Sequence, residues 1–275
     1  MFLAIIKGTV MSNACDREHF SRQTGFTLIE MMVVICIIAV LASALTVSVR
    51  SGYKQARQAS CKANLRQFGV GLTIYRGEHE NRVPDWISNL YPDYVDARGM
   101  YVCQADDNQG KDTPRPLRLV EIKKAKNETD TSPFWDNEKN SDATRNKTVE
   151  CCSYLYEFSH AKAPSSWWSS VAWPGGQKPG GSLTMGQYKT AQMQYGDDSS
   201  KVNGVYVPYS ASRIPIIRCY HHWRDQMIWG YNDAKAKESG RATRQYITLN
   251  VAYAGNVFTG PLYWEGTIHP GETVK

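Results

Sequence analysis

The stretch that decides the fold is Met31–Val49, MMVVICIIAVLASALTVSV, which holds no charged residue over 19 positions. A helix of about 20 apolar residues is long enough to cross a bilayer. Glu30 stands directly before this run. A carboxylate there needs a partner, because a charged side chain in a membrane helix costs about 2.5–3.5 kcal/mol at the bilayer centre and less near the edge. The sequence predicts one membrane-spanning helix followed by a long polar region.

The helical pattern continues beyond the apolar run. Apolar residues recur at alternating steps of four and three, at Cys61, Leu65, Phe68, Leu72 and Tyr75. Lys and Arg lie between them, so this part is amphipathic, with one face turned to a core. Gly69 and Gly71 each weaken it by up to about 1 kcal/mol relative to alanine. We expect a helix from Phe26 to Arg76, about 75 Å long at 1.5 Å per residue.

The averages over all 275 residues, 42% hydrophobic and 21% charged with a mean hydropathy of −0.46, exclude a multi-span membrane protein and a largely disordered chain. The net charge of +6 is small, and Lys and Arg are scattered along the chain. We therefore predict no nucleic-acid partner. The sequence has no P-loop, GxGxxG or GxSxG motif, so we predict that the protein is not an enzyme.

The junction GFTLIE, Gly25–Glu30, followed by the apolar run, resembles the prepilin processing site of type IV pilins and type II secretion pseudopilins. The resemblance implies cleavage after Gly25 by a prepilin peptidase and N-methylation of the new N-terminal residue, Phe26. It also implies that Glu30 pairs with the N-terminal amine of a neighbouring subunit during assembly. Such a pair is reasonable, because a cation and an anion in lipid are each costly alone and tolerable together.

This resemblance divides the chain into a leader over residues 1–25, a transmembrane and assembly helix over 26–49, and a head over 50–275 that includes the second half of the helix. A start at Met11 gives a short polar leader, which is the usual form in the family. The expected location is the inner membrane, crossed once, with the head in the periplasm or on the cell surface.

A second resemblance covers the helix beyond the membrane. Cys61–Gln67, CKANLRQ, with Tyr75 is similar to a group of bacterial pseudopilin-like proteins that carry a CxxNLxQ helix. The segment Leu249–Phe258 looks like the ending of the same group, although the turn here is Ala254-Gly255-Asn256 and not Asp-Gly-His. The middle of the chain resembles nothing known to us.

The head is expected to be α+β, with the long helix on a mostly antiparallel sheet, as in pilins. Residues 164–186 are rich in Pro, Gly, Ser and Trp and predict a long irregular excursion. The two-residue step Ala254-Gly255 is suited to a hairpin between the last two strands. The predicted strands are Leu117–Ile122, Cys151–Phe158, Val202–Tyr209, Pro215–Tyr220, Tyr246–Tyr253 and Asn256–Leu262.

Five of the seven cysteines lie beyond the apolar run, at Cys61, Cys103, Cys151, Cys152 and Cys219. An exported head permits disulfides. We predict a bond between Cys61 and Cys103, and a second between Cys219 and either Cys151 or Cys152; the alternative is five reduced, buried thiols. The absence of a CxxC pair argues against a zinc ribbon or a thioredoxin-like site.

Other chemistry-bearing residues give weaker patterns, and we predict no metal and no cofactor. His221 and His222, with Asp225 nearby, point to opposite faces if they lie on a strand, so we expect ordinary loop or core residues. Asp106-Asp107 and Asp197-Asp198 are carboxylate pairs, but they lack the alternating ligands of a calcium loop.

Five of the eight tryptophans lie between residues 167 and 229, at Trp167, Trp168, Trp173, Trp223 and Trp229. Exposed, coplanar rings there favour a membrane-tethered module that captures carbohydrate or protein, whereas packed rings indicate a core under a long loop. Our first prediction is a structural subunit of a type II secretion pseudopilus or a type IV pilus-like filament. Its partners are the inner membrane, other pilin or pseudopilin subunits and prepilin peptidase.

Overall fold

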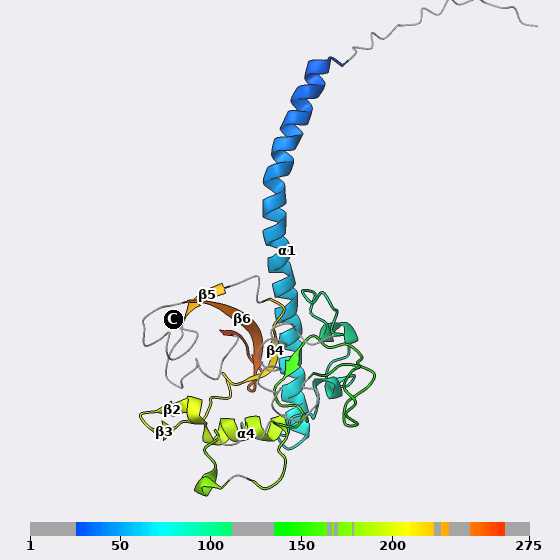
Figure 1. The fold of residues 1–275 in the computed structure, drawn as a ribbon. Helices are drawn as coiled ribbons and strands as arrows, with labels where there is room; N and C mark the ends of the chain where they lie inside the picture. Colours follow the sequence, from blue (N-terminus) through cyan, green and yellow to red (C-terminus); the bar gives the residue numbers. More distant parts are fainter. Residues whose placement is uncertain are drawn as a thin grey trace, which may run out of the picture. The chain divides into compact units, whose positions relative to one another are not determined.

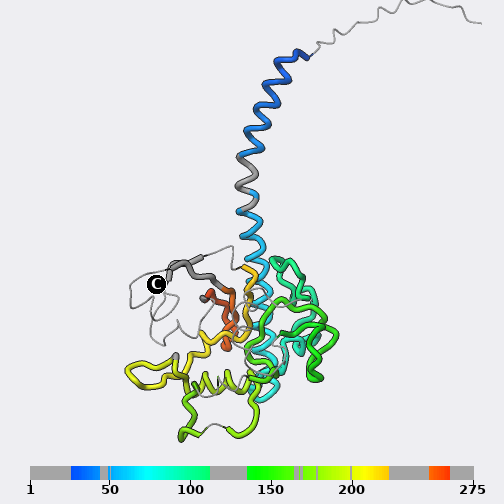
Figure 2. Tube along the Cα trace, in the orientation of Figure 1, coloured from blue at the N-terminus to red at the C-terminus, as the bar shows by residue number. Residues whose placement is uncertain are grey.

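The structure, a computed structural model, describes residues 26–111, 135–163, 167, 170–177, 179–222, 227–230 and 243–261 (Figure 1). Figure 2 also draws in grey the helix and strand residues whose side chains are not described, among them residues 44–48, 227–230 and 243–247. Its fold is α+β, with an N-terminal helix and an antiparallel sheet (Figure 1). The chain divides into two compact units between Arg50 and Ser51. The predicted strand at Leu117–Ile122 lies outside the described residues.

Helix α1 spans Leu28–Glu78, within two residues of the predicted helix at each end. It begins with a capping box, because the Thr27 hydroxyl accepts from the Glu30 amide at 3.3 Å and the Glu30 carboxylate accepts from the Thr27 amide at 2.9 Å. The amides of Thr27 and Glu30, which a helix start would otherwise leave unpaired, thus both have acceptors. After the helix the chain turns through Glu80 and Asn81, which have positive φ values of 54° and 63°.

Within the part of the chain that the structure describes, no helix has the combination of length and apolar character that a membrane crossing requires. The predicted transmembrane segment over 26–49 is therefore not confirmed.

The predicted amphipathic stripe of α1 faces the core of the head. Cys61, Leu65, Phe68 and Leu72 are at most 2% exposed, and Tyr75 is partly buried against the same core. The ring of Phe68 packs edge-to-face on those of two tyrosines, with centroids 4.9 and 5.5 Å away, at Tyr101 and Tyr154. These contacts join the second half of α1 to the head.

The two glycines in α1 have a packing role that the sequence did not reveal. A Cβ atom at Gly69 would lie 2.3 Å from the Gly255 carbonyl oxygen, and one at Gly71 would lie 3.0 Å from the Tyr94 carbonyl oxygen. The distance at Gly69 is too short for any real side chain, and that at Gly71 would require its neighbour to move by a few tenths of an ångström. The helix gives up some intrinsic stability at these positions and gains close contact with two backbone segments.

The main sheet has strand order β1-β4-β6-β5, with β7 also paired to β6, and every pairing is antiparallel. The strands are β1 (Leu155–Tyr156), β4 (Pro215–Cys219), β5 (Met227–Gly230), β6 (Thr243–Ala252) and β7 (Val257–Pro261). In the register, Ile217 of β4 and Val257 of β7 both pair with Val251 of β6. The predicted hairpin between the last two strands is present, with four connecting residues and Gly255 at φ 91°.

Two predictions for the middle of the chain need correction. The expected strand over Cys151–Phe158 is only two residues long in β1, and the expected strand over Val202–Tyr209 is a short exposed hairpin of β2 (Lys201–Val202) and β3 (Val205–Tyr206). Directly after the irregular excursion lies a helix that we did not predict, α4 (Met185–Tyr195). Its sequence signal is the capping box of Thr184 with Gln187.

Short 3-10 helices complete the fold. They are η1 (Ile87–Leu90), η2 (Arg98–Tyr101), η3 (Pro174–Gly176) and η4 (Asp198–Ser200).

Helix α4 is joined to the sheet by Glu157, whose carboxylate lies 3.4 Å from Lys189 Nζ of α4 and 3.1 Å from Arg218 Nη1 of β4. All three side chains are at most 6% exposed, so the two cations share one buried carboxylate inside the head.

Candidate functional site

The N-terminal turn of α1 carries the residues predicted to be processed and to direct assembly. Phe26 is 72% exposed. The Glu30 carboxylate accepts from both the amide and the hydroxyl of Thr27, at 2.9 and 2.8 Å. Gly25 lies outside the described residues. The structure therefore presents Phe26 to its surroundings and holds Glu30 over the start of the helix.

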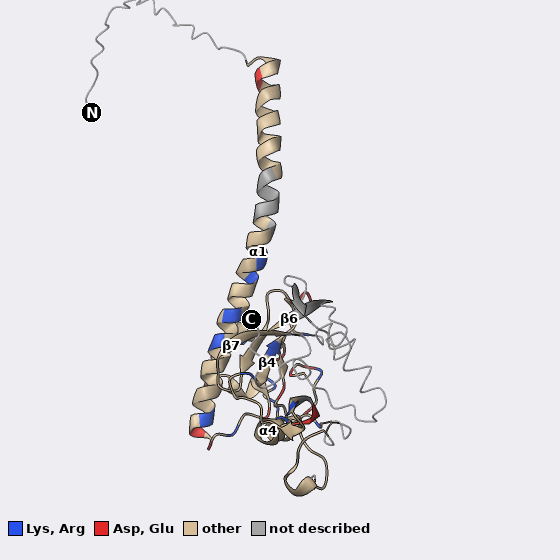
Figure 3. Ribbon diagram, turned by 90° about the vertical axis from the view of Figure 1, so that its left-hand side faces the viewer, with Lys and Arg blue, Asp and Glu red and all other residues tan. Residues whose placement is uncertain are grey.

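The apolar run after Glu30 has no covering within its own unit. Every large hydrophobic side chain given for residues 26–41 is at least 44% exposed. Between Glu30 and Arg50 the sequence has no charged residue. Figure 3 shows the first part of this stretch in tan, below a single acidic residue and before the grey part of α1. An apolar surface of this extent marks contact with a membrane or with another protein.

A second candidate site lies in the head and is built from three cysteines and a histidine. Cys61 comes from α1, Cys103 from the segment after η2, and Cys219 from the end of β4, with His222 in the turn that follows. All four residues are at most 2% exposed. Their ligand atoms lie within 4.8 Å of one another, and Cys103 Sγ is 3.3 Å from His222 Nε2.

The contacts inside this cluster shift the pKa values of its three thiols in different directions. Hydrogen bonds from Cys219 and Cys61, with His222 adding to them, hold the pKa of Cys103 far below its usual range. The hydrogen bond to Cys103 raises the pKa of Cys61, and burial raises that of Cys219. The hydroxyl of Tyr154 lies 3.9 Å from Cys61 Sγ and adds a polar group to the cluster.

The predicted disulfides are not formed in the structure, where the six described cysteines are free. Cys61 and Cys103 do come together as predicted, but they share their surroundings with Cys219 and His222. Cys152 is buried elsewhere in the core and its thiol donates to the Tyr154 carbonyl, while Cys151 is only partly buried. Cys219 is thus grouped with the two cysteines of the other predicted bond.

The two adjacent histidines lie in the turn after β4, not on a strand, and they point to different partners. His221 Nε2 lies 3.1 Å from the Ser153 carbonyl oxygen and 3.5 Å from the Asp106 carboxylate, whereas His222 faces Cys103. Sequence reasoning missed the gathering of four ligands because they come from segments far apart in the chain. The only local signal is the C-x-x-H spacing of Cys219 and His222.

The first aspartate of each acidic pair accepts hydrogen bonds from nearby protein groups. The Asp106 carboxylate accepts from the amides of Asn108 and Gly110 and from the Ser153 hydroxyl. The Asp197 carboxylate accepts from the Gln192 amide group and the Tyr209 hydroxyl. These carboxylate oxygens are occupied by protein donors.

The described tryptophans of the 167–229 region pack on α4. The Trp167 ring is tilted by 44° to that of Tyr188, and the Trp173 ring by 51° to that of Tyr195. Both tryptophans are partly buried against a small apolar cluster centred on α4. Trp168, Trp223 and the side chain of Trp229 lie outside the described residues. The coplanar, exposed arrangement that favours a capture surface is not found for Trp167 and Trp173.

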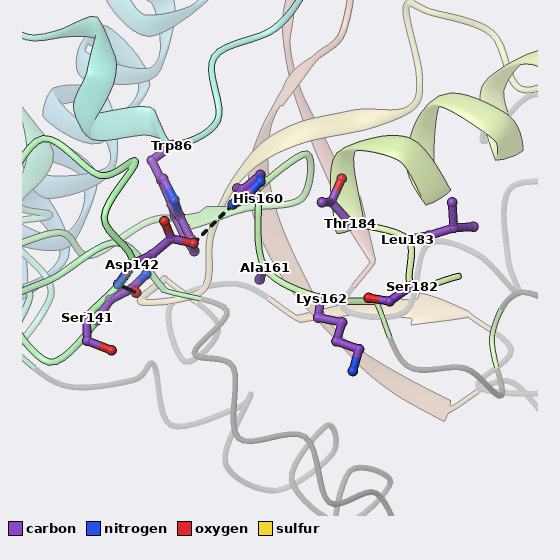
Figure 4. A pocket seen from close by; sticks show the side chains of 10 residues that line it. Trp86, Ser141, Asp142, His160, Ala161, Lys162, Ser182, Leu183 and Thr184 are labelled. Atoms are coloured by element: carbon purple, nitrogen blue, oxygen red, sulfur yellow. Dashed lines mark hydrogen bonds and ion pairs between the residues drawn. The ribbon is translucent and has the colours of Figure 1, made fainter. Parts of the chain in front are cut away.

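A cavity of about 530 Å³ lies beside Trp86 and the start of α4 (Figure 4). On its wall His160 Nδ1 is 3.1 Å from the Asp142 carboxylate. Partial burial of Asp142 opposes ionisation, but hydrogen bonds from Thr144 and then His160 hold the pKa of its carboxyl below the usual value. Ser141 and Ser182 line the same cavity, and the His160 imidazole is oriented by its contact with Asp142.

Comparison with known proteins bears on the N-terminal segment. Residues 20–46 match the family model of the prokaryotic N-terminal methylation motif, which is the signature of type IV pilins and pseudopilins. The recognition based on GFTLIE is thereby confirmed. No curated protein and no solved structure matches the chain.

Proposed function

We propose that the protein is a structural subunit of a type II secretion pseudopilus or a type IV pilus-like filament, anchored in the inner membrane before assembly and without enzymatic activity. One observation supports this most directly: the methylation signature over residues 20–46 coincides with a helix whose apolar side chains are exposed. Soluble monomers rarely expose an apolar surface of this size, because its contact with water is unfavourable. In the proposed subunit, lipid or the helices of other subunits cover it.

In this proposal prepilin peptidase cleaves after Gly25, and the new N-terminal residue is Phe26, which is then N-methylated. Glu30 stands one helical turn from that amine, and its carboxylate is held by Thr27. In the filament the carboxylate pairs with the amine of a neighbouring subunit. The capping contacts keep the carboxylate at the helix start, where a neighbour's amine can reach it.

The test is co-expression of the full chain with a prepilin peptidase, followed by membrane fractionation and mass spectrometry of the N-terminal peptide. We expect a membrane-bound chain that begins at a methylated Phe26. An intact bond between Gly25 and Phe26 would show that the chain is not processed as a pilin.

Assembly is tested separately with Glu30→Gln, which removes the charge and keeps the shape of the side chain. We expect processing to persist and incorporation into filaments to be lost. Asp96→Asn is the matched control, because Asp96 is an exposed carboxylate of the head. Equal incorporation of Glu30→Gln and Asp96→Asn would contradict the assembly role.

A further inference from the structure

We propose that Cys61, Cys103, Cys219 and His222 bind one Zn²⁺ ion as a closed, structural site in the head. This inference does not rest on the proposed function, because all four residues lie in the unit that begins at Ser51.

The geometry fits a tetrahedral ion. With Zn–S bonds of about 2.3 Å and Zn–N bonds of about 2.0 Å, the ligand atoms of a tetrahedral site are about 3.5–3.8 Å apart. In the structure these four atoms lie within 4.8 Å of one another, and the sulfur of Cys103 is 3.3 Å from His222 Nε2. Small side-chain movements bring all four onto one ion.

The ligand set favours zinc over other common ions. Thiolate-rich tetrahedral sites select zinc, whereas calcium and magnesium take oxygen ligands. Three cysteines with one histidine form one of the usual structural zinc sets. The four residues are at most 2% exposed, so the coordination is completed by protein groups with no open position for a substrate.

Binding of zinc also changes the charge of this buried cluster. When zinc binds, the cysteines give up their protons and the site holds three thiolates, one neutral imidazole and one Zn²⁺, for a net charge of −1. The Tyr154 hydroxyl, 3.9 Å from Cys61 Sγ, then donates to that thiolate and offsets part of the buried charge.

The consequence for the head is a cross-link between distant segments. Cys61 lies on the buried stripe of α1, Cys103 follows η2, and Cys219 and His222 follow the central strand β4. An ion bound by residues from these three segments fixes the helix to the sheet in the way that a disulfide would. Thiolates bound to the ion are also unavailable for disulfide formation.

The experiment uses the full chain, purified in detergent without a polyhistidine tag, and measures zinc and iron per chain by elemental analysis. We expect one zinc per chain. We also expect cobalt to replace it with the intense visible bands of a tetrahedral, thiolate-bound ion. A chain without stoichiometric zinc, or one that holds iron instead, would overturn the proposal.

Variants then assign the ligands. Cys219→Ser is expected to lose zinc, whereas Cys152→Ser, the matched control, is expected to keep it because Cys152 is buried outside the cluster. His222→Cys retains four ligands, so it is expected to bind cobalt with a shifted spectrum even if Cys219→Ser fails to fold. Equal zinc loss in Cys152→Ser and Cys219→Ser, or an unchanged cobalt spectrum in His222→Cys, would refute the assignment.

Alkylation separates the zinc site from a disulfide. In the denatured, unreduced chain we expect all three cluster cysteines to react once a chelator has removed the metal. A bond between any two of them leaves two unreactive, which supports the disulfide and contradicts the metal site.

Discussion

The two halves of α1 share a helical backbone, but their apolar side chains differ in how far they are buried. In the first half the large apolar side chains from Leu28 to Leu41 are 44–79% exposed. In the second half the stripe at Cys61, Leu65, Phe68 and Leu72 is at most 2% exposed. The half that contains more apolar residues is therefore the one without a core.

This difference teaches that apolar content does not by itself decide burial within a chain. The second half alternates apolar with charged residues, and the head supplies a surface that matches its stripe. The first half is apolar on all sides, and a helix of that kind is covered either by lipid or by other helices. In the proposed function lipid or other subunits cover the first half, whereas the second half packs on the head of its own chain.

The largest expected effect breaks the packing of the second half. Phe68→Ala removes a fully buried ring from between Tyr101 and Tyr154, and we expect it to lower the free energy of unfolding by about 4 kcal/mol. Urea denaturation of the full chain in detergent, followed by tryptophan fluorescence, measures this. All eight tryptophans lie between Trp86 and Trp264, so the signal reports the head alone.

The matched change in the first half is Ile37→Ala, at a position 54% exposed. We expect it to leave the unfolding of the head within about 0.5 kcal/mol of the unaltered chain. Similar losses in the two variants would mean that the first half contributes to the core of the head, and the contrast between the halves would be wrong.

A smaller effect tests the glycines of α1. Gly69→Ala places a methyl group 2.3 Å from the Gly255 carbonyl oxygen, and we expect a loss of about 2 kcal/mol in the same denaturation experiment. At Gly52 no atom lies within 4 Å of a new Cβ. Gly52→Ala is therefore expected to be neutral or to stabilise the helix by up to about 1 kcal/mol. Destabilisation by both changes alike would remove the close contact as the reason for Gly69.

The sequence predicted those helices and strands that carry a regular short-range pattern of apolar residues. The four-and-three spacing from Cys61 to Tyr75 is a helical period, and β4 and β6 lie where β-branched and aromatic residues cluster. Helix α4 was missed because it follows a stretch rich in Gly, Ser and Trp. Its start is marked only by Thr184 and Gln187.

The candidate sites differ in the same way. Gly25–Glu30 is a contiguous motif, so it could be recognised from the sequence alone. Cys61, Cys103 and Cys219 are brought together by the packing of α1 against β4 and the segment after η2, and no short-range spacing encodes that. The expected pairing of Cys61 with Cys103 found half of the cluster. Cys219 and His222 required the tertiary structure.

The smallest expected effect compares two capping boxes, one in each region. Thr184 caps α4 inside the head, where the helix packs on the core. Thr184→Ala leaves the Gln187 amide without its hydroxyl acceptor, and we expect a loss of about 1 kcal/mol in the tryptophan-monitored unfolding. Thr184→Ser keeps the hydroxyl and is expected to recover most of that loss.

Thr27 caps the first turn of α1, where the neighbouring side chains are exposed. Thr27→Ala is expected to leave the unfolding of the head unchanged and to speed amide hydrogen exchange only in the first turn, because fraying there is not coupled to the core. A shift of the head's unfolding by Thr27→Ala would show that the two regions fold together. An unchanged exchange rate in the first turn would show that Glu30 is held at the helix start by something other than Thr27.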